Sequence, residues 1–118
     1  MSWHPVGLAD LVSLISRDLR ECSAEQREFF ARTRITPAKW LLPHWGDEGG
    51  GFWAVAVHEQ RVLWYNDIED GFNVSRFEVP GHIPRDEYWC NQDSLRRALP
   101  RLRRDHGAPA GPSEAVDA

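Results

Sequence analysis

The first third of the chain carries apolar residues at the spacing of helices. Within residues 6–22 they recur every three or four positions, which predicts an amphipathic helix that buries Leu8, Leu11, Val12, Ile15, Leu19 and Cys22. The following "SAEQ" is a capping-box sequence, in which Ser23 accepts from a helix amide and Gln26 reaches back to the cap. A second helix is therefore expected from Ala24 to about Arg32, with Phe29 and Phe30 buried.

The middle of the chain changes to the period of two that is typical of β-strands. First, "TPAK" at 36–39 has a capping threonine and a proline at the first position, which predicts a short helical turn. After a break rich in proline and glycine at 41–51, residues 52–59 and 61–66 alternate as a hairpin. A third strand follows over 72–79. Phe72 and Val74 alternate in one phase and Phe77 and Val79 in the other, which predicts a β-bulge near Ser75 and Arg76.

The last third returns to the helical period. Residues 79–91 contain two prolines and a glycine and are expected to be irregular, with a short strand around Glu87 to Cys90. A final helix is expected from Asn91 or Asp93, kinked or split by Pro100. Its predicted buried residues are Leu95, Ala98, Leu99 and Leu102.

These elements predict an α+β fold, in which N-terminal helices pack on an antiparallel β-meander of three or more strands and a C-terminal helix closes the core. One domain is expected over residues 1–106. Residues 107–118 are small residues and prolines with almost no apolar anchor, which predicts a disordered tail.

Charge and composition narrow the classes of partner. The chain of 118 residues has a formal net charge of −4, which argues against general binding to nucleic acids or anionic membranes, since both favour a basic surface. It has no apolar run of about 18 residues and no signal-peptide pattern. Its two cysteines, Cys22 and Cys90, form no C-x-x-C pair, so free thiols in a reducing cytoplasm are expected. The oligomeric state is left open.

The candidate chemistry centres on three acids, Asp67, Glu69 and Asp70, in the loop between the second and third strands. A calcium loop is not indicated, because Ile68 and Phe77 occupy positions where the EF-hand needs oxygen ligands. A pair of catalytic carboxylates is the alternative, and would make the chain a small hydrolase or a carbohydrate-binding protein that also uses an exposed tryptophan.

Other catalytic patterns are incomplete. The five histidines show no metal-ligand spacing, and a Cys90–His82 pair would depend on the tertiary structure. The acids of "GDEGGG" at 46–51 would repel a phosphate. We therefore predict no catalytic residue, no metal site and no cofactor, although the sequence leaves open whether the protein is an enzyme.

A protein-binding surface is the interpretation of the acidic loop that requires the fewest additional functional residues. The three acids would steer the approach of a partner with a basic surface, and flanking aromatic side chains would supply buried contact area. The predicted partner-binding residues are Asp67, Glu69, Asp70, Trp64, Tyr65 and Phe72.

Residues 29–67, "FFARTRITPAKWLLPHWGDEGGGFWAVAVHEQRVLWYND", resemble the Smi1/Knr4-like (SUKH) superfamily. Pro43, Gly46, Asp47 and Gly49–Gly51 match a glycine loop of that group, residues 62–67 match its second strand, and residues 94–102 stand for its late helix. An early "NG" of the group is missing, and residues 67–72 do not continue its pattern. The resemblance implies a bacterial immunity protein that binds and neutralises a toxin, without catalytic residues.

Overall fold

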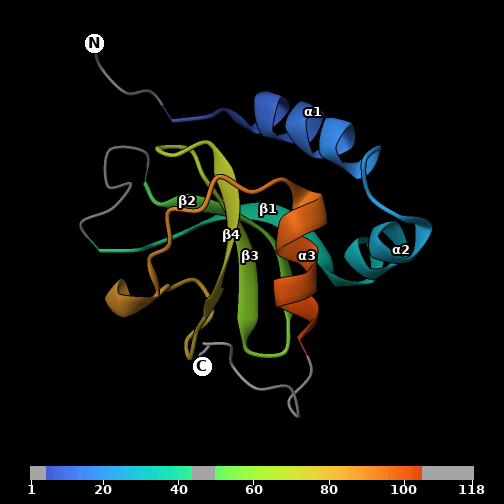
Figure 1. The fold of residues 1–118 in the computed structure, drawn as a ribbon. Helices are drawn as coiled ribbons and strands as arrows, with labels where there is room; N and C mark the ends of the chain where they lie inside the picture. The colour runs from blue at the N-terminus through green and yellow to red at the C-terminus, as the bar shows by residue number, and fades with distance from the viewer. Residues whose placement is uncertain (1–4, 44–49, 105–118) are drawn as a thin grey trace.

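The computed structural model describes residues 5–43 and 50–104. In these residues the helices are α1 (Leu8–Leu19), α2 (Ala24–Thr33) and α3 (Leu95–Arg103), with a 3-10 turn, η2 (Arg85–Glu87). The strands are β1 (Arg34–Trp40), β2 (Phe52–His58), β3 (Arg61–Asn66) and β4 (Gly71–Arg76). The strands form an antiparallel sheet in the order β1-β2-β3-β4 (Figure 1). The predicted α+β fold is therefore confirmed. In the described residues no helix is long and apolar enough to span a membrane.

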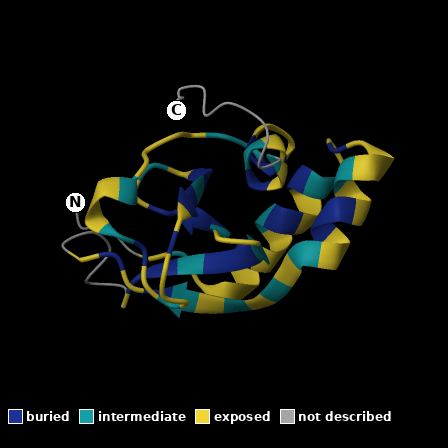
Figure 2. Ribbon diagram, turned by 90° about the horizontal axis from the view of Figure 1, so that it is seen from below, coloured by how far each residue is buried: buried dark blue, intermediate teal, exposed yellow. Residues whose placement is uncertain are grey.

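The sheet is buried on both faces, by different kinds of structure. The three helices cover one face, where α3 places Leu95, Ala98, Leu99 and Leu102 against strand residues such as Leu63 and Phe72. The other face holds Trp40, Phe52 and Trp64, which pack against Phe77 and Ile83 of the segment after β4. Figure 2 shows the buried residues gathered in the strands and on the inner faces of the helices.

The segment at 77–93 crosses the second face and returns. Near β1, the amide of Ile83 donates to the carbonyl oxygen of Leu41 over 2.8 Å. Near β4, the amide of Phe72 donates to the carbonyl oxygen of Asp93 over 2.8 Å. The strand predicted around Glu87 to Cys90 does not form. Instead, side chains of β3 and β4 bind this segment, as when the Asn73 amide and carbonyl groups pair with the backbone of Asn91.

Helix α1 forms as predicted but is rotated about its axis. Leu8 and Val12, expected on the buried face, are 48% and 47% exposed. Leu11, Ile15 and Cys22 are buried as predicted, and Asp18 joins them on the buried face. The reason is a polar contact: the Asp18 carboxylate accepts a hydrogen bond from the Leu95 amide over 3.0 Å, so this side of α1 turns toward α3.

The predicted helical turn at 36–39 is wrong, because these residues belong to β1. Pro37 is tolerated there because β1 is an edge strand with β2 on one side only, where a missing amide costs little. The register with β2 is irregular between Arg34 and Ala38, on either side of the proline.

The predicted bulge near Ser75 and Arg76 is also wrong. The pairing of β3 with β4 is continuous from Arg61–Arg76 to Asn66–Gly71. Ser75 shares a face with Phe77, and it is buried because its hydroxyl accepts from Trp64 Nε1 over 2.8 Å and donates to the Glu87 carbonyl. Because Ser75 is polar, the sequence pattern did not mark it as a buried residue on the Phe77 face. The alternation of apolar residues therefore looked like a change of phase along the strand. The bulge lies in the β2–β3 pairing, between Ala54 and Ala56.

Helix α3 continues through Pro100, so the proline does not split it into two turns. A proline cannot donate to the carbonyl four residues earlier, here that of Arg96. That carbonyl accepts from Gln26 Nε2 over 3.0 Å instead. The same glutamine completes the predicted capping box of α2, where its Oε1 accepts from the Ser23 amide. The predicted tail at 107–118 and residues 46–49 of the glycine loop lie outside the described residues.

Candidate functional site

The loop between β3 and β4 is a tight turn held by one buried side chain. Asn66 Oδ1 accepts from the amides of Ile68 and Glu69 over 3.0 and 3.2 Å. Asp70 closes the turn with a positive φ of 60°, a conformation that aspartate tolerates better than most residues. Gly71 follows because a Cβ there would lie 2.3 Å from the backbone of Asn91.

The aromatic residues predicted to flank the acids belong to the core. Trp64 is 0% exposed, Tyr65 5% and Phe72 1%. Each lies within a strand whose two faces are both covered, so these rings pack inside the molecule and offer a partner no exposed ring surface. The prediction of an aromatic-flanked surface is therefore corrected, and contact with a partner is left to the exposed residues of the turn.

Of the three acids, Asp67 is also buried. Its Oδ2 accepts from the amide of Val6 over 2.8 Å, while the carbonyl of Val6 accepts from Trp53 Nε1 over 2.9 Å. The peptide groups of Val6 are thus held on both sides, which fixes the segment that leads into α1. Burial raises the pKa of Asp67, although the Val6 amide and Lys39 act in the opposite direction. Asp70 is exposed and Glu69 partly so.

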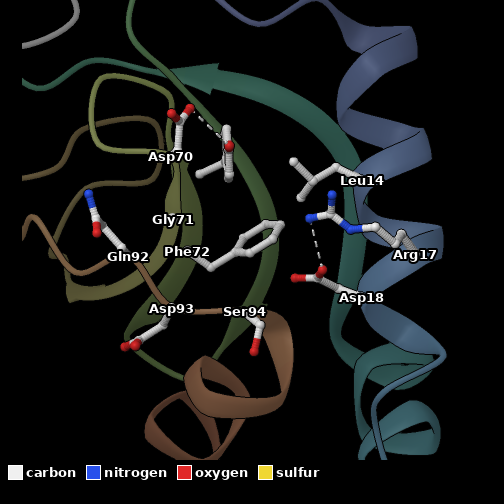
Figure 3. Close-up of a pocket in the computed structure, with 10 residues that line it drawn as sticks. Leu14, Arg17, Asp18, Asp70, Gly71, Phe72, Gln92, Asp93 and Ser94 are labelled. Carbon is white, nitrogen blue, oxygen red and sulfur yellow. Dashed lines mark hydrogen bonds and ion pairs between the residues drawn. The ribbon is translucent and has the colours of Figure 1, made fainter.

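Asp70 also lines a cleft of about 420 Å³ between α1, the β3–β4 turn and the residues before α3 (Figure 3). Leu14 and Phe72 supply its apolar lining. The full set of lining residues is Leu14, Arg17, Asp18, Tyr65, Asp70, Gly71, Phe72, Gln92, Asp93 and Ser94. Figure 3 shows Asp70 and Asp18 on different sides of the Phe72 side chain, with the Asp93 carboxylate turned away from that ring.

Tyr65 places a phenol group beside Asp70 in this cleft. Its hydroxyl donates to Asp70 Oδ1 over 3.4 Å. Burial, together with the nearby Asp70 carboxylate, raises the pKa of Tyr65 to about 12. The phenol is therefore a neutral hydrogen-bond donor near pH 7, and it orients the carboxylate of Asp70.

The other two carboxylates are anchored by cationic or backbone groups. Asp18 Oδ1 lies 3.3 Å from Arg17 Nη2, and its Oδ2 caps the first amide of α3 at Leu95. Asp93 forms an ion pair with Arg101. Since Arg17 is the only cationic residue that lines the cleft among the described residues, the lining carries more negative than positive charge.

Asp18 and Asp93 were missed by the sequence reasoning. Asp18 lies in the helical stripe three residues after Ile15, and an acid in that position is a usable signal of a buried contact. Nothing in the sequence around Asp93 indicated that it would lie beside the β3–β4 turn, since that contact depends on the return path of the 77–93 segment.

The described part of the chain contains no group of three or more His, Cys, Asp or Glu side chains that could hold a metal ion. Cys22 is buried and Cys90 exposed, both as free thiols, and burial raises the pKa of Cys22 above its usual value.

Comparison with protein-family models, with curated proteins and with solved structures found no match to this chain.

Proposed function

We propose that this protein is a non-enzymatic protein-binding domain whose acidic cleft receives a basic segment of a partner. The observation that carries the proposal is that Asp18, Asp70 and Asp93 line one cleft together with the partly exposed Leu14. A lysine or arginine side chain has the matching chemistry, because its apolar stem packs on hydrophobic groups and its charged end binds carboxylates.

The turn residues extend this acidic surface beyond the cleft. Glu69 lies beside Asp70 in the turn and is partly exposed. Charges at the rim of a binding site accelerate the approach of an oppositely charged partner. The role first predicted for six residues is thus proposed for Glu69 and Asp70 together with the cleft, while the buried residues Trp64, Tyr65, Phe72 and Asp67 support it from inside.

The resemblance to the Smi1/Knr4-like superfamily supports a more specific form of the proposal. A bacterial immunity protein would act in the cytoplasm, where free thiols such as Cys22 and Cys90 persist, and would neutralise a toxin by binding it. The toxins that such immunity proteins neutralise are often nucleases. A nuclease carries a basic surface for its nucleic-acid substrate, and an acidic cleft is complementary to that charge.

The test compares two double variants with equal loss of charge. One, Glu69→Gln with Asp70→Asn, changes the turn, and the other, Glu78→Gln with Asp86→Asn, changes acids exposed elsewhere. Each protein is used to capture partners from the native cell, and association rates with a purified partner are measured at several salt concentrations. We expect the turn variant to associate more slowly and with a weaker dependence on salt, because steering is screened over about 10 Å at 0.1 M.

The control variant should associate like the wild type. Equal rates for all three proteins, with no dependence on salt, would place the binding face elsewhere. Turnover of a substrate by the purified protein would contradict the non-enzymatic part of the proposal.

A further inference from the structure

The outer face of α3 is made of arginine. Between Ser94 and Arg104 the buried positions are leucine and alanine, and no acidic residue occurs. Apart from Pro100, the positions that remain after the N-cap are Arg96, Arg97, Arg101, Arg103 and Arg104. Because α3 lies on the outside of the sheet (Figure 1), these side chains form one basic surface, which we call the arginine face.

Ion pairs within the protein neutralise only part of the arginine face. Arg101 pairs with Asp93, and Arg103 lies 3.4 Å from Glu25, whose side chain is 75% exposed. The Arg103 guanidinium also lies 5.4 Å from the centre of the Phe29 ring, which holds it in place. Arg96 and Arg97 are exposed, and in the described residues neither forms an ion pair.

The position of Arg96 and Arg97 is unfavourable for the helix itself. They occupy the second and third residues of α3, in the first turn, where the helix dipole disfavours positive charge. The three later arginines lie at the end of the helix, where the dipole favours them. The stability of the helix therefore explains why arginines lie at the end of α3. It does not explain why Arg96 and Arg97 lie at its beginning.

We propose that the arginine face is a second interaction surface, and that its ligand is an acidic segment of a protein. Arginine forms paired hydrogen bonds with carboxylates, which suits aspartate and glutamate side chains. The ligand has to be short, because an acidic ligand that extends beyond α3 would meet a remainder of the molecule with a negative net charge. The chain carries −4 in total, so without the five arginines of α3 and its C-cap the rest of the molecule carries −9.

This charge distribution disfavours an extended polyanion. Nine helical residues span about 14 Å, so a nucleic acid bound to α3 would extend beyond the helix, over a remainder of the molecule whose net charge is negative. An acidic peptide segment of similar length makes the favourable contacts without the unfavourable ones. The arginine face is thus complementary to a local acidic patch, while the cleft proposed above takes a basic one.

The experiment measures binding of a short, labelled Asp/Glu-rich peptide to the full chain at low and physiological salt. The test variant is Arg96→Gln with Arg97→Gln, and the matched control is Arg20→Gln with Arg85→Gln, which removes the same charge from exposed positions outside α3. We expect the α3 variant to bind the peptide at least about fivefold more weakly, from two lost exposed ion pairs, and the control to bind within about twofold of the wild type.

Thermal unfolding separates lost binding from lost folding. Since Arg96 and Arg97 oppose the helix dipole, the α3 variant should melt at the same temperature as the wild type or higher. Equal weakening in both variants would overturn the proposal, as would the absence of peptide binding even at low salt. Tighter binding of duplex DNA or of anionic vesicles than of the peptide, at the same salt, would also overturn it. None of these substitutions touches the acidic cleft, so the two proposals fail independently.

Discussion

Asp18 joins the first helix to the last, and its removal should destabilise the fold. The N-cap residue of α3, Ser94, makes no capping bond with its side chain, so the first amide of the helix depends on Asp18 Oδ2, 3.0 Å from the Leu95 nitrogen. Asp18 is only 6% exposed and Leu95 is fully buried, so the carboxylate shields this amide from water. In Asp18→Ala the Leu95 amide would remain buried without an acceptor.

The size of the effect follows from that single contact. A buried donor that loses its acceptor costs about 1–3 kcal/mol, and the loss of an N-cap acceptor costs about 0.5–2 kcal/mol. Both ranges describe the same bond and are not added, so we expect a loss of about 2 kcal/mol. For a domain of this size that corresponds to a fall of roughly 8 °C or more in the thermal midpoint.

Unfolding in urea, followed by the fluorescence of the six tryptophans, provides the assay. Asp18→Asn retains an oxygen acceptor and should lose less stability than Asp18→Ala. Arg17→Gln removes the other partner of Asp18, but the Arg17 side chain is 68% exposed, so the loss should be below about 1 kcal/mol. An Asp18→Ala protein as stable as Arg17→Gln would refute the claim that Asp18 caps α3.

Two further predictions concern the β-sheet and the N-terminal segment. Burial raises the pKa of Asp67 above 3.8, so the folded protein holds this proton more tightly than the unfolded chain, and the stability it contributes is lost as the pH rises through the folded pKa. Asp67→Asn should therefore gain stability relative to the wild type as the pH rises above about 3.8; a difference that does not change with pH in denaturant titrations would contradict this. Trp64→Ala should cost about 3–5 kcal/mol, because the fully buried ring leaves a cavity and Ser75 loses its donor. Trp53→Ala should cost less free energy of unfolding than Trp64→Ala, because Trp53 is half-buried. An equal fall in the melting temperature of the two variants would mean that burial does not determine which tryptophan matters more for stability.

Local patterns in the sequence predicted most of the elements. The capping box at Ser23 and Gln26 located the start of α2, and alternation located β2 and β3. The four apolar residues of α3 were identified because helical spacing depends only on neighbours along the chain. The acids of the β3–β4 loop were recognised because the two flanking strands, which define the loop, are also visible in the local sequence pattern.

Where the prediction was wrong, a contact between distant residues had decided the outcome. Residues 36–39 form a strand because β2 lies beside them, and Pro37 survives there only because the other edge is open. Pro100 does not split α3, and Gln26, 70 positions away in the sequence, donates to the Arg96 carbonyl that the proline leaves without its helical partner.

For the candidate site, the sequence by itself determined which residues carry charge and which segments form helices or strands. Only the tertiary structure decided which carboxylates share a surface. It buried Asp67 against Val6, took Trp64 and Phe72 into the core, and brought Asp18 and Asp93 to the cleft beside Asp70. The physical reason is that burial and charge proximity depend on how the elements pack, and the periodicity of one segment contains no information about the segment that will cover it.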